Sequence, residues 1–128
     1  MTKIYVIPIV PITKKNSQRI VNVKGRPIII PSKAYKDYEK ACKPYLTHSE
    51  EPINYPVNVE CVYSMPTRRR VDLVNLEEAT LDVLVKYGVL ADDNSRIVVG
   101  MDGSRVRYNK ENPGVIVTIR SLDDEEIL

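Results

Sequence analysis

The stretch Arg68–Asn94, which reads RRRVDLVNLEEATLDVLVKYGVLADDN, decides the fold of this chain and most of its predicted chemistry. Apolar residues recur through it at the three- and four-residue spacing of one face of an α-helix. Gly88 then supplies a helix stop, and an Asp-Asp-Asn turn follows. The stretch therefore predicts an amphipathic helix with cations before it and carboxylates at both ends.

The same helix carries polar and apolar residues outside its core face. Its predicted polar stripe consists of Asn75, Glu78, Asp82 and Lys86. A second apolar flank consists of Val74, Leu81 and Val85. Because a small sheet covers one side of a helix, two apolar flanks favour additional cover by a second subunit, and we expect a homodimer.

The rest of the chain predicts strands around two main helices. Strands are expected over Lys3–Val10, over the hairpin Arg19–Ile30 that turns at Lys24-Gly25, and over the alternating segment Val57–Tyr63. Ser32 is the expected cap of a first helix. Further strands are expected over Arg96–Met101 and Gly114–Ser121, with Asp102-Gly103 as a candidate hairpin turn. This order predicts an α+β domain with a small mixed sheet over residues 1–122, followed by an acidic tail over residues 123–128.

Charge is distributed unevenly along the 128 residues. Residues 1–70 carry 13 Lys and Arg against 5 Asp and Glu, whereas residues 71–128 carry 6 against 12. Such asymmetry indicates polyanion binding by one surface and an acidic site or tail elsewhere. Cys42 and Cys61 lack the spacing of a zinc site or disulfide framework, and no export or membrane segment is recognised, so we expect a cytoplasmic protein.

The arginines and carboxylates together indicate chemistry on a phosphate backbone. Guanidinium groups suit bidentate phosphate contacts, although a run of arginines is by default a solvated loop. Mg²⁺ held by carboxylate oxygens can activate water and shield phosphate charge during phosphodiester hydrolysis. Asp92 and Asp93, taken alone, are more typical of a turn than of a metal site. A helix of this length also separates them from Asp72 by roughly 20 Å, at ~1.5 Å per residue.

The order of these parts resembles the RusA family of Holliday junction resolvases. In that family an arginine-rich stretch meets Asp-x-Asp-Asn, a helix follows, and Asp-Asp comes after a glycine. The positions in register are Asp72, Asn75, Asp82, Gly88, Asp92 and Asp93. Val74 stands where the family has its second aspartate, and Glu78 stands where it has a helix lysine.

The resemblance implies a homodimeric endonuclease, dependent on Mg²⁺ or alternatively Mn²⁺, that cuts four-way junctions or other branched DNA. It implies catalytic roles for Asp72 and Asp93. Glu78 departs from the family pattern but lies one turn beyond Val74, so it is a candidate for a relocated catalytic carboxylate. The implied metal ligands are Asp72, Asp92, Asp93 and Glu78. The implied DNA contacts are Lys14, Lys15, Arg19, Arg68, Arg69 and Arg70.

Several alternatives stay open at this point. Asn75-x-x-Glu78 also matches a capping box, in which Glu78 would accept a hydrogen bond from the Asn75 backbone instead of binding metal. Loss of a carboxylate at Val74 would suit a non-catalytic DNA-binding module that keeps the same scaffold. A protein-interaction domain with purely structural acids is a third reading.

Overall fold

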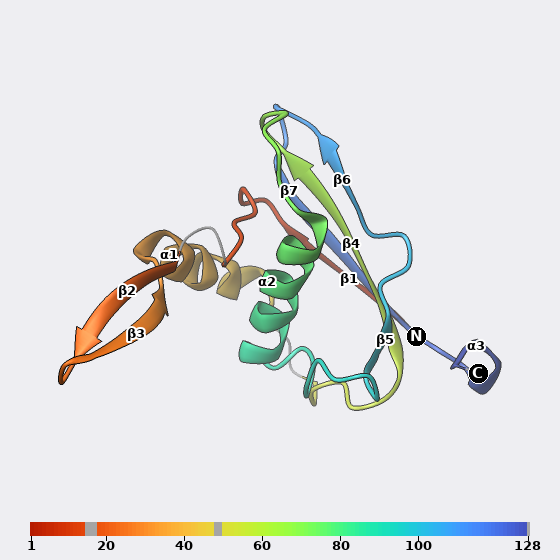
Figure 1. The fold of residues 1–128 in the computed structure, drawn as a ribbon. Helices are drawn as coiled ribbons and strands as arrows, with labels where there is room; N and C mark the ends of the chain where they lie inside the picture. The colour runs from red at the N-terminus through yellow and green to blue at the C-terminus, as the bar shows by residue number, and fades with distance from the viewer. Residues whose placement is uncertain (15–17, 48–49, 128) are drawn as a thin grey trace.

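Two sheets and two long helices form the α+β architecture of the computed structural model, which describes residues 1–14, 18–47 and 50–127 (Figure 1). The larger sheet contains β1 (Thr2–Ile7), β4 (Val57–Met65), β5 (Val98–Gly100), β6 (Arg105–Tyr108) and β7 (Gly114–Ser121). The smaller sheet contains β2 (Gln18–Val23) and β3 (Arg26–Pro31). The helices are α1 (Lys33–Cys42), the short 3₁₀ helix η2 (Lys43–Tyr45), α2 (Leu73–Lys86) and α3 (Asp124–Ile127). The predicted fold class is confirmed.

The larger sheet is mixed, as predicted. β7 lies between β1 and β4 and runs antiparallel to both, whereas β5 and β6 both pair with β4 in parallel. The alternation expected in β4 is present, because Val57, Val59, Cys61 and Tyr63 are all fully buried on one face. The opposite face of β4 carries Asn58, Glu60, Val62 and Ser64.

The predicted hairpin at Asp102-Gly103 is wrong in one respect. The chain does turn there, with the Ser104 amide donating to the Met101 carbonyl at 3.2 Å, but β5 and β6 then follow the same edge of β4 in the same direction. Asn58 holds this turn through two hydrogen bonds with the Asp102 backbone, at 2.8 and 3.1 Å. The predicted strand over Arg96–Met101 shortens to β5, and β6 is an element that sequence periodicity did not identify.

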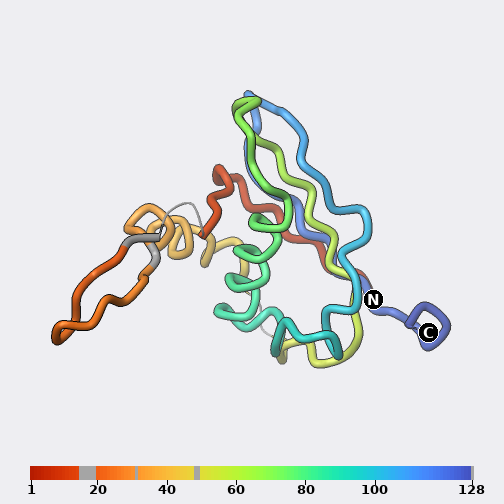
Figure 2. The backbone as a smooth tube through the Cα atoms, in the orientation of Figure 1, coloured from red at the N-terminus to blue at the C-terminus, as the bar shows by residue number. Residues whose placement is uncertain are grey.

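The predicted N-terminal hairpin and helix cap are confirmed, whereas the first strand covers Thr2–Ile7 and ends before Pro8, not at Val10 as predicted. β2 and β3 form the expected antiparallel hairpin, and Lys24 and Gly25 both have positive φ, at 53° and 77°, as a tight two-residue turn requires. Ser32 caps α1, because its Oγ accepts a hydrogen bond from the Tyr35 amide at 3.2 Å. The tube in Figure 2 shows this hairpin extending beyond α1 and away from the larger sheet.

Helix α2 packs on one face of the larger sheet and contributes much of the core. Its buried residues are Leu76, Ala79, Thr80, Val83 and Leu84. The Thr80 and Tyr63 hydroxyls lie 2.7 Å apart and join α2 to β4 inside the core. Gly88, with φ of 76°, ends the helix as predicted. Leu90 then forms an isolated bridge with Ile53, which fixes the chain that leaves α2.

The C-terminal segment is partly ordered as a helix instead of being wholly irregular. In α3 the Glu126 carboxylate accepts a hydrogen bond from the Arg120 guanidinium at 2.7 Å. Cys42 and Cys61 are both buried free thiols. Within the described ranges, none of the helices has the length and apolar character needed to cross a bilayer.

Candidate nucleic-acid interface and acidic site

Arginine side chains line an open groove between the end of β4 and the edge strand β6. The groove has a volume of about 300 Å³ and lies directly before α2. It is lined by Met65, Thr67, Arg68, Arg69, Arg70, Val71, Val106, Arg107 and Tyr108. We call this the arginine groove. The predicted run Arg68–Arg70 is exposed in it, so its guanidinium groups are accessible to an anion.

Two contacts shape the arginine groove. The Arg68 guanidinium carbon lies 4.5 Å from the centroid of the Tyr108 ring, within the range of a cation–π contact. The Asn109 amide donates to the Met65 carbonyl at 2.9 Å and holds the end of β6 against β4. The sequence reasoning missed Tyr108, although its place beside the alternating basic residues of Arg105-Val-Arg-Tyr was a usable signal.

Asp72 lies at the point where the arginine groove meets α2. It is the N-cap residue of the helix and has extended backbone dihedrals, but its side chain makes no capping bond to the backbone. Instead, its Oδ2 accepts a hydrogen bond from the Asn75 side-chain amide at 3.2 Å. One residue, Val71, separates Asp72 from the run of arginines. A carboxylate is thus adjacent to a surface that suits phosphate.

The capping-box reading of Glu78 is wrong. That reading requires Asn75 to be the N-cap, but the helix begins earlier, at Leu73, with Asp72 as its cap. Glu78 is therefore inside the helix, exposed to solvent. Val74 is also helical, not extended, and 70% of its surface is exposed. In an extended segment, the side chains of residues 72 and 74 would point to the same side. Because Val74 is in the helix, its side chain does not point the same way as that of Asp72.

Asp92 and Asp93 occupy an exposed turn after α2. The Asp92 carboxylate accepts hydrogen bonds from the Asp93 amide at 2.8 Å and from the Asn94 side chain at 2.9 Å. These bonds hold the pKa of Asp92 below its usual value. Partial burial raises the pKa of Asp93, and the neighbouring Asp92 and Asp82 carboxylates raise it further. Asp92 therefore accepts local hydrogen bonds of the kind found in turns, whereas the environment of Asp93 raises its pKa.

The predicted ligands are spread along α2, with Asp72 at its start, Glu78 inside it, and Asp92 and Asp93 after its end. The helix has 14 residues. At ~1.5 Å per residue it is about 21 Å long. Figure 1 shows the segment between α2 and β5 at the C-terminal end of the helix, with the chain entering α2 at the opposite end. Within residues 1–14, 18–47 and 50–127, no three or more His, Cys, Asp or Glu side chains are grouped so that they could hold a metal ion.

An N-terminal lysine contacts the acidic stripe of α2. The Lys14 ammonium lies 3.1 Å from Oδ2 of Asp82 and 5.9 Å from the centroid of the Tyr35 ring. Tyr35 is fully buried, and its hydroxyl has no hydrogen-bond partner in the part of the chain that the structure describes. Burial is the main cause of the raised pKa of Tyr35, to which the charges of Glu39, Asp82 and Glu78 also contribute.

The other two basic residues predicted to contact DNA cannot be compared with the geometry. Lys15 lies outside the described residues, and Arg19 belongs to β2 without a described side chain.

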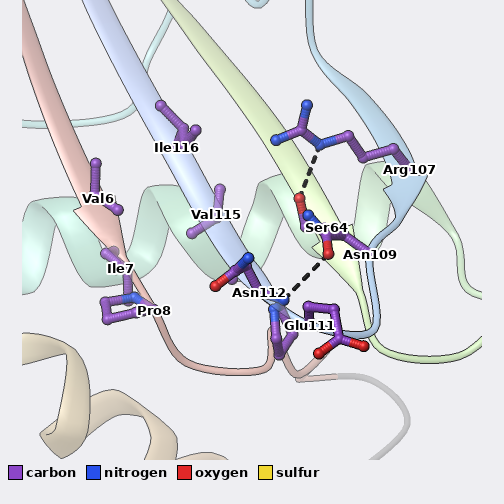
Figure 3. Close-up of a pocket in the computed structure, with 12 residues that line it drawn as sticks. Val6, Ile7, Pro8, Ser64, Arg107, Asn109, Glu111, Asn112, Val115 and Ile116 are labelled. Carbon is purple, nitrogen blue, oxygen red and sulfur yellow. Dashed lines mark hydrogen bonds between the residues drawn. The ribbon is translucent and has the colours of Figure 1, made fainter.

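A second cavity lies on the other face of the sheet and contains none of the predicted site residues. It has a volume of about 330 Å³ and is walled by β1, β7 and the loop after β6 (Figure 3). Val6, Pro8 and Ile116 form its apolar side. Arg107 donates to the Ser64 hydroxyl at 2.9 Å at its edge. Among the residues that line this cavity, Glu111 is the one carboxylate. The cavity therefore lacks a group of acids that could hold a metal ion.

Comparison with known proteins gives one family. The family model described as endodeoxyribonuclease RusA matches residues 8–120 of the 128-residue chain. The matched region includes the arginine groove, α2 and the turn at Asp92 and Asp93. No curated protein matches the chain significantly.

Proposed function

Because the chain belongs to the RusA family of Holliday junction resolvase nucleases, we propose that it is a homodimeric, Mg²⁺-dependent endonuclease that cuts four-way junctions and related branched DNA by paired phosphodiester hydrolysis. Mn²⁺ is the alternative ion. The twofold symmetry of such a dimer matches that of a junction, so each subunit can cut one of two equivalent strands.

The observation that carries this proposal is the position of Asp72 in the chain, directly after Val71, which lines the arginine groove. Guanidinium groups bind phosphate in a planar, bidentate manner, and three exposed arginines in sequence offer several such contacts. The contact between Arg68 and Tyr108 restricts one of them, which lowers the entropy lost when phosphate binds. A phosphodiester held here would lie close to the Asp72 carboxylate.

The arrangement of charges supports separate roles for the arginines, which would bind phosphate, and for the carboxylates, which would take part in hydrolysis. Arginines neutralise the approaching phosphates, so that a carboxylate can stand near the DNA without repelling it. Asp93 is predicted to act with Asp72, and partial burial together with the nearby Asp92 and Asp82 carboxylates raises the pKa of Asp93. A cation bound near Asp93 would offset these effects.

The fit to a metal ion is incomplete in one subunit. The proposed ligands are Asp72, Asp92, Asp93 and Glu78, whose oxygen donors are those that Mg²⁺ prefers. The described residues, however, contain no group of three acids that could hold an ion, and α2 separates Asp72 from Asp93. One described chain therefore does not present a complete magnesium site.

A second candidate function is a DNA-binding module without catalysis. It is favoured by the side chain at position 74, where an exposed valine stands and contributes no oxygen ligand. Such a protein would bind junctions through the arginine groove and leave them intact. The Asp72 and Asp92 carboxylates would then serve only as acceptors of local hydrogen bonds, from the Asn75 side chain and from the turn after α2 respectively.

Incubation of the protein with labelled junction, duplex and flap DNA tests both candidates. If the protein is the proposed enzyme, it should cut the junction symmetrically in Mg²⁺ and leave the duplex intact. Cleavage should stop when EDTA removes the metal ion. A titration over Mg²⁺ and Mn²⁺ concentrations gives the apparent affinity for each ion. Tight junction binding without cleavage in either ion would establish the binding module, and absence of binding would exclude both.

A further inference from the structure

The floor of the arginine groove is apolar and exposed. Val106 and Tyr108, on the edge strand β6, have 38% and 43% of their surfaces exposed. They pair with Tyr63 and Met65 of β4, so their side chains lie on the sheet face that carries α2. Tyr63 is fully buried and hydrogen-bonded to Thr80 of α2, whereas Val106 and Tyr108 stay uncovered at the edge of the sheet (Figure 1).

Arg68 and Tyr108 form a stacked pair on this floor. The Arg68 guanidinium carbon lies 4.5 Å from the centroid of the Tyr108 ring. One guanidinium covers only one face of a ring, and Tyr108 remains 43% exposed despite the contact. A stacked guanidinium directs its N–H groups outward in its own plane, where they can still bind phosphate. The pair is therefore a flat aromatic surface held beside cations.

The lining of the arginine groove combines cations with apolar side chains. Among the described residues that line it, four are arginines and none is an acid. Duplex DNA presents phosphates and sugars to such a surface while its bases stay stacked, so phosphate binding alone leaves the apolar floor without a role. A single strand presents phosphates and base faces together, and proteins bind it with a positively charged groove and aromatic side chains. The lining therefore favours unpaired DNA over duplex.

We propose that the arginine groove binds an unpaired nucleotide of branched DNA, with its base stacked on Tyr108 and its phosphates on Arg69 and Arg70. Val106 would contact the same base, and Arg68 would hold the ring in place. The groove volume of about 300 Å³ is at the lower end of the range for small-molecule sites, roughly 300–1,000 Å³, and suits a single nucleotide. Because every base has a flat face, the stack would accept any of the four bases.

The inference rests on the proposed function, because it names the form of DNA that the arginine groove takes. The nucleotide would lie near the start of α2, since Val71 lines the groove and Asp72 follows it in the chain. A base that is already unpaired leaves its stack at the lowest cost. Junctions with unpaired nucleotides at the branch point should therefore bind more tightly than fully paired junctions.

Two single strands of equal length and charge test the stack. Fluorescence anisotropy compares labelled oligothymidylate with an oligonucleotide of the same length whose central sugars lack bases. The wild-type protein should bind oligothymidylate about fivefold or more tightly, the lower end of the range for one base stacked on an aromatic side chain. Equal affinities would overturn the inference, whereas retained junction binding in the same assay would leave the proposed function intact. Absence of binding to both strands and to junctions would contradict the proposed function itself.

Variants of Tyr108 assign the preference to the ring. Tyr108→Ala should remove the preference for bases, whereas Tyr108→Phe should keep it, because phenylalanine offers the same ring face. The salt dependence of binding by Tyr108→Ala should match that of the wild type, since no cation is lost. Tyr45→Ala is the control, because Tyr45 lies on η2 and is exposed to nearly the same extent, 44%.

Circular dichroism of each variant checks that the protein folds. If Tyr108→Ala keeps the preference for bases, or if Tyr108→Phe loses it while folded, Tyr108 does not stack on a base and the inference is wrong.

Discussion

The Lys14 ammonium lies 3.1 Å from Oδ2 of Asp82, and this ion pair connects the N-terminal segment to the polar stripe of α2 across 68 residues of sequence. Both side chains are about one-third exposed, so the pair contributes at most about 1 kcal/mol to stability. Its importance is electrostatic. The pair places a cation beside Asp82, and the negative charge of Asp82 contributes to the raised pKa of Asp93.

The pairing leads to a prediction about DNA binding. Lys14→Gln should reduce the salt dependence of junction binding by less than Arg68→Gln does, because the Lys14 ammonium already has a carboxylate partner. A phosphate contact made by Arg68 is worth roughly 0.9 in the log–log slope on duplex-like DNA. Fluorescence anisotropy at several salt concentrations measures both slopes. If the two variants lost the same amount of salt-dependence slope, Lys14 would have to leave Asp82 and bind phosphate.

The arginine groove gives a larger predicted effect. Replacement of Arg68, Arg69 and Arg70 by alanine should reduce the slope by up to about 2.7, if each arginine contacts one phosphate. Replacement of Lys33, Lys36 and Lys40, which are exposed on α1, is the matched control for the same change in net charge. If both triple variants lose the same slope, the arginine groove has no special role.

The two proposed catalytic aspartates should separate cleavage from binding. Asp72→Asn and Asp93→Asn should each reduce junction cleavage to background in Mg²⁺, because each removes a proposed carboxylate ligand of the ion. Binding should be retained or strengthened, since a negative charge near phosphate is removed. Asp37→Asn, an exposed acid on α1, should cut normally. Full cleavage by the Asp72 and Asp93 variants would exclude them as ligands.

Glu78 distinguishes a relocated ligand from an incidental acid. If Glu78 replaces the missing carboxylate at Val74, Glu78→Gln should abolish Mg²⁺-dependent cleavage, whereas Glu77→Gln should not, because Glu77 lies on a different side of α2. The double variant Val74→Asp with Glu78→Lys should recover the cleavage lost in Glu78→Gln. A natural protein without activity that gains cleavage only in the double variant would identify the non-catalytic binding module.

Buried tyrosine and cysteine side chains predict a loss of stability at alkaline pH. Burial raises the pKa of the Cys61 thiol from 9.0 to about 12, and burial also raises the pKa of Tyr38 and Tyr63. These groups ionise first in the unfolded chain, so stability is fully present below about pH 9 and is lost as pH rises toward the folded-state pKa values. Each such group lowers the free energy of unfolding by roughly 1.4 kcal/mol per pH unit in this window.

Thermal unfolding between pH 8 and pH 11, followed together with tyrosinate absorbance, measures this dependence. The absorbance change of the buried tyrosines should coincide with unfolding. A titration of all eight tyrosines in the folded protein would contradict the burial argument.

The amino-acid sequence alone determined those elements that depend on a few neighbouring residues. The Lys24-Gly25 turn, the Ser32 cap, the alternation in β4 and the glycine stop after α2 each depend on backbone preferences or burial patterns within a few residues. The run of arginines before a carboxylate at a helix entrance is likewise a property of neighbouring residues.

Tertiary structure alone decided which distant residues meet. β6 has no buried face of its own and exists because it pairs with β4, some 40 residues earlier in the chain, as the 43-residue separation of Ser64 and Arg107 illustrates. The same holds for the contacts of Tyr108 with Arg68 and of Lys14 with Asp82. Such contacts arise when packing of the sheet and helix closes long loops, and the free energy of that closure is not encoded in any local pattern. Local patterns therefore identified the acids and the cations, whereas the fold determined which of them became neighbours.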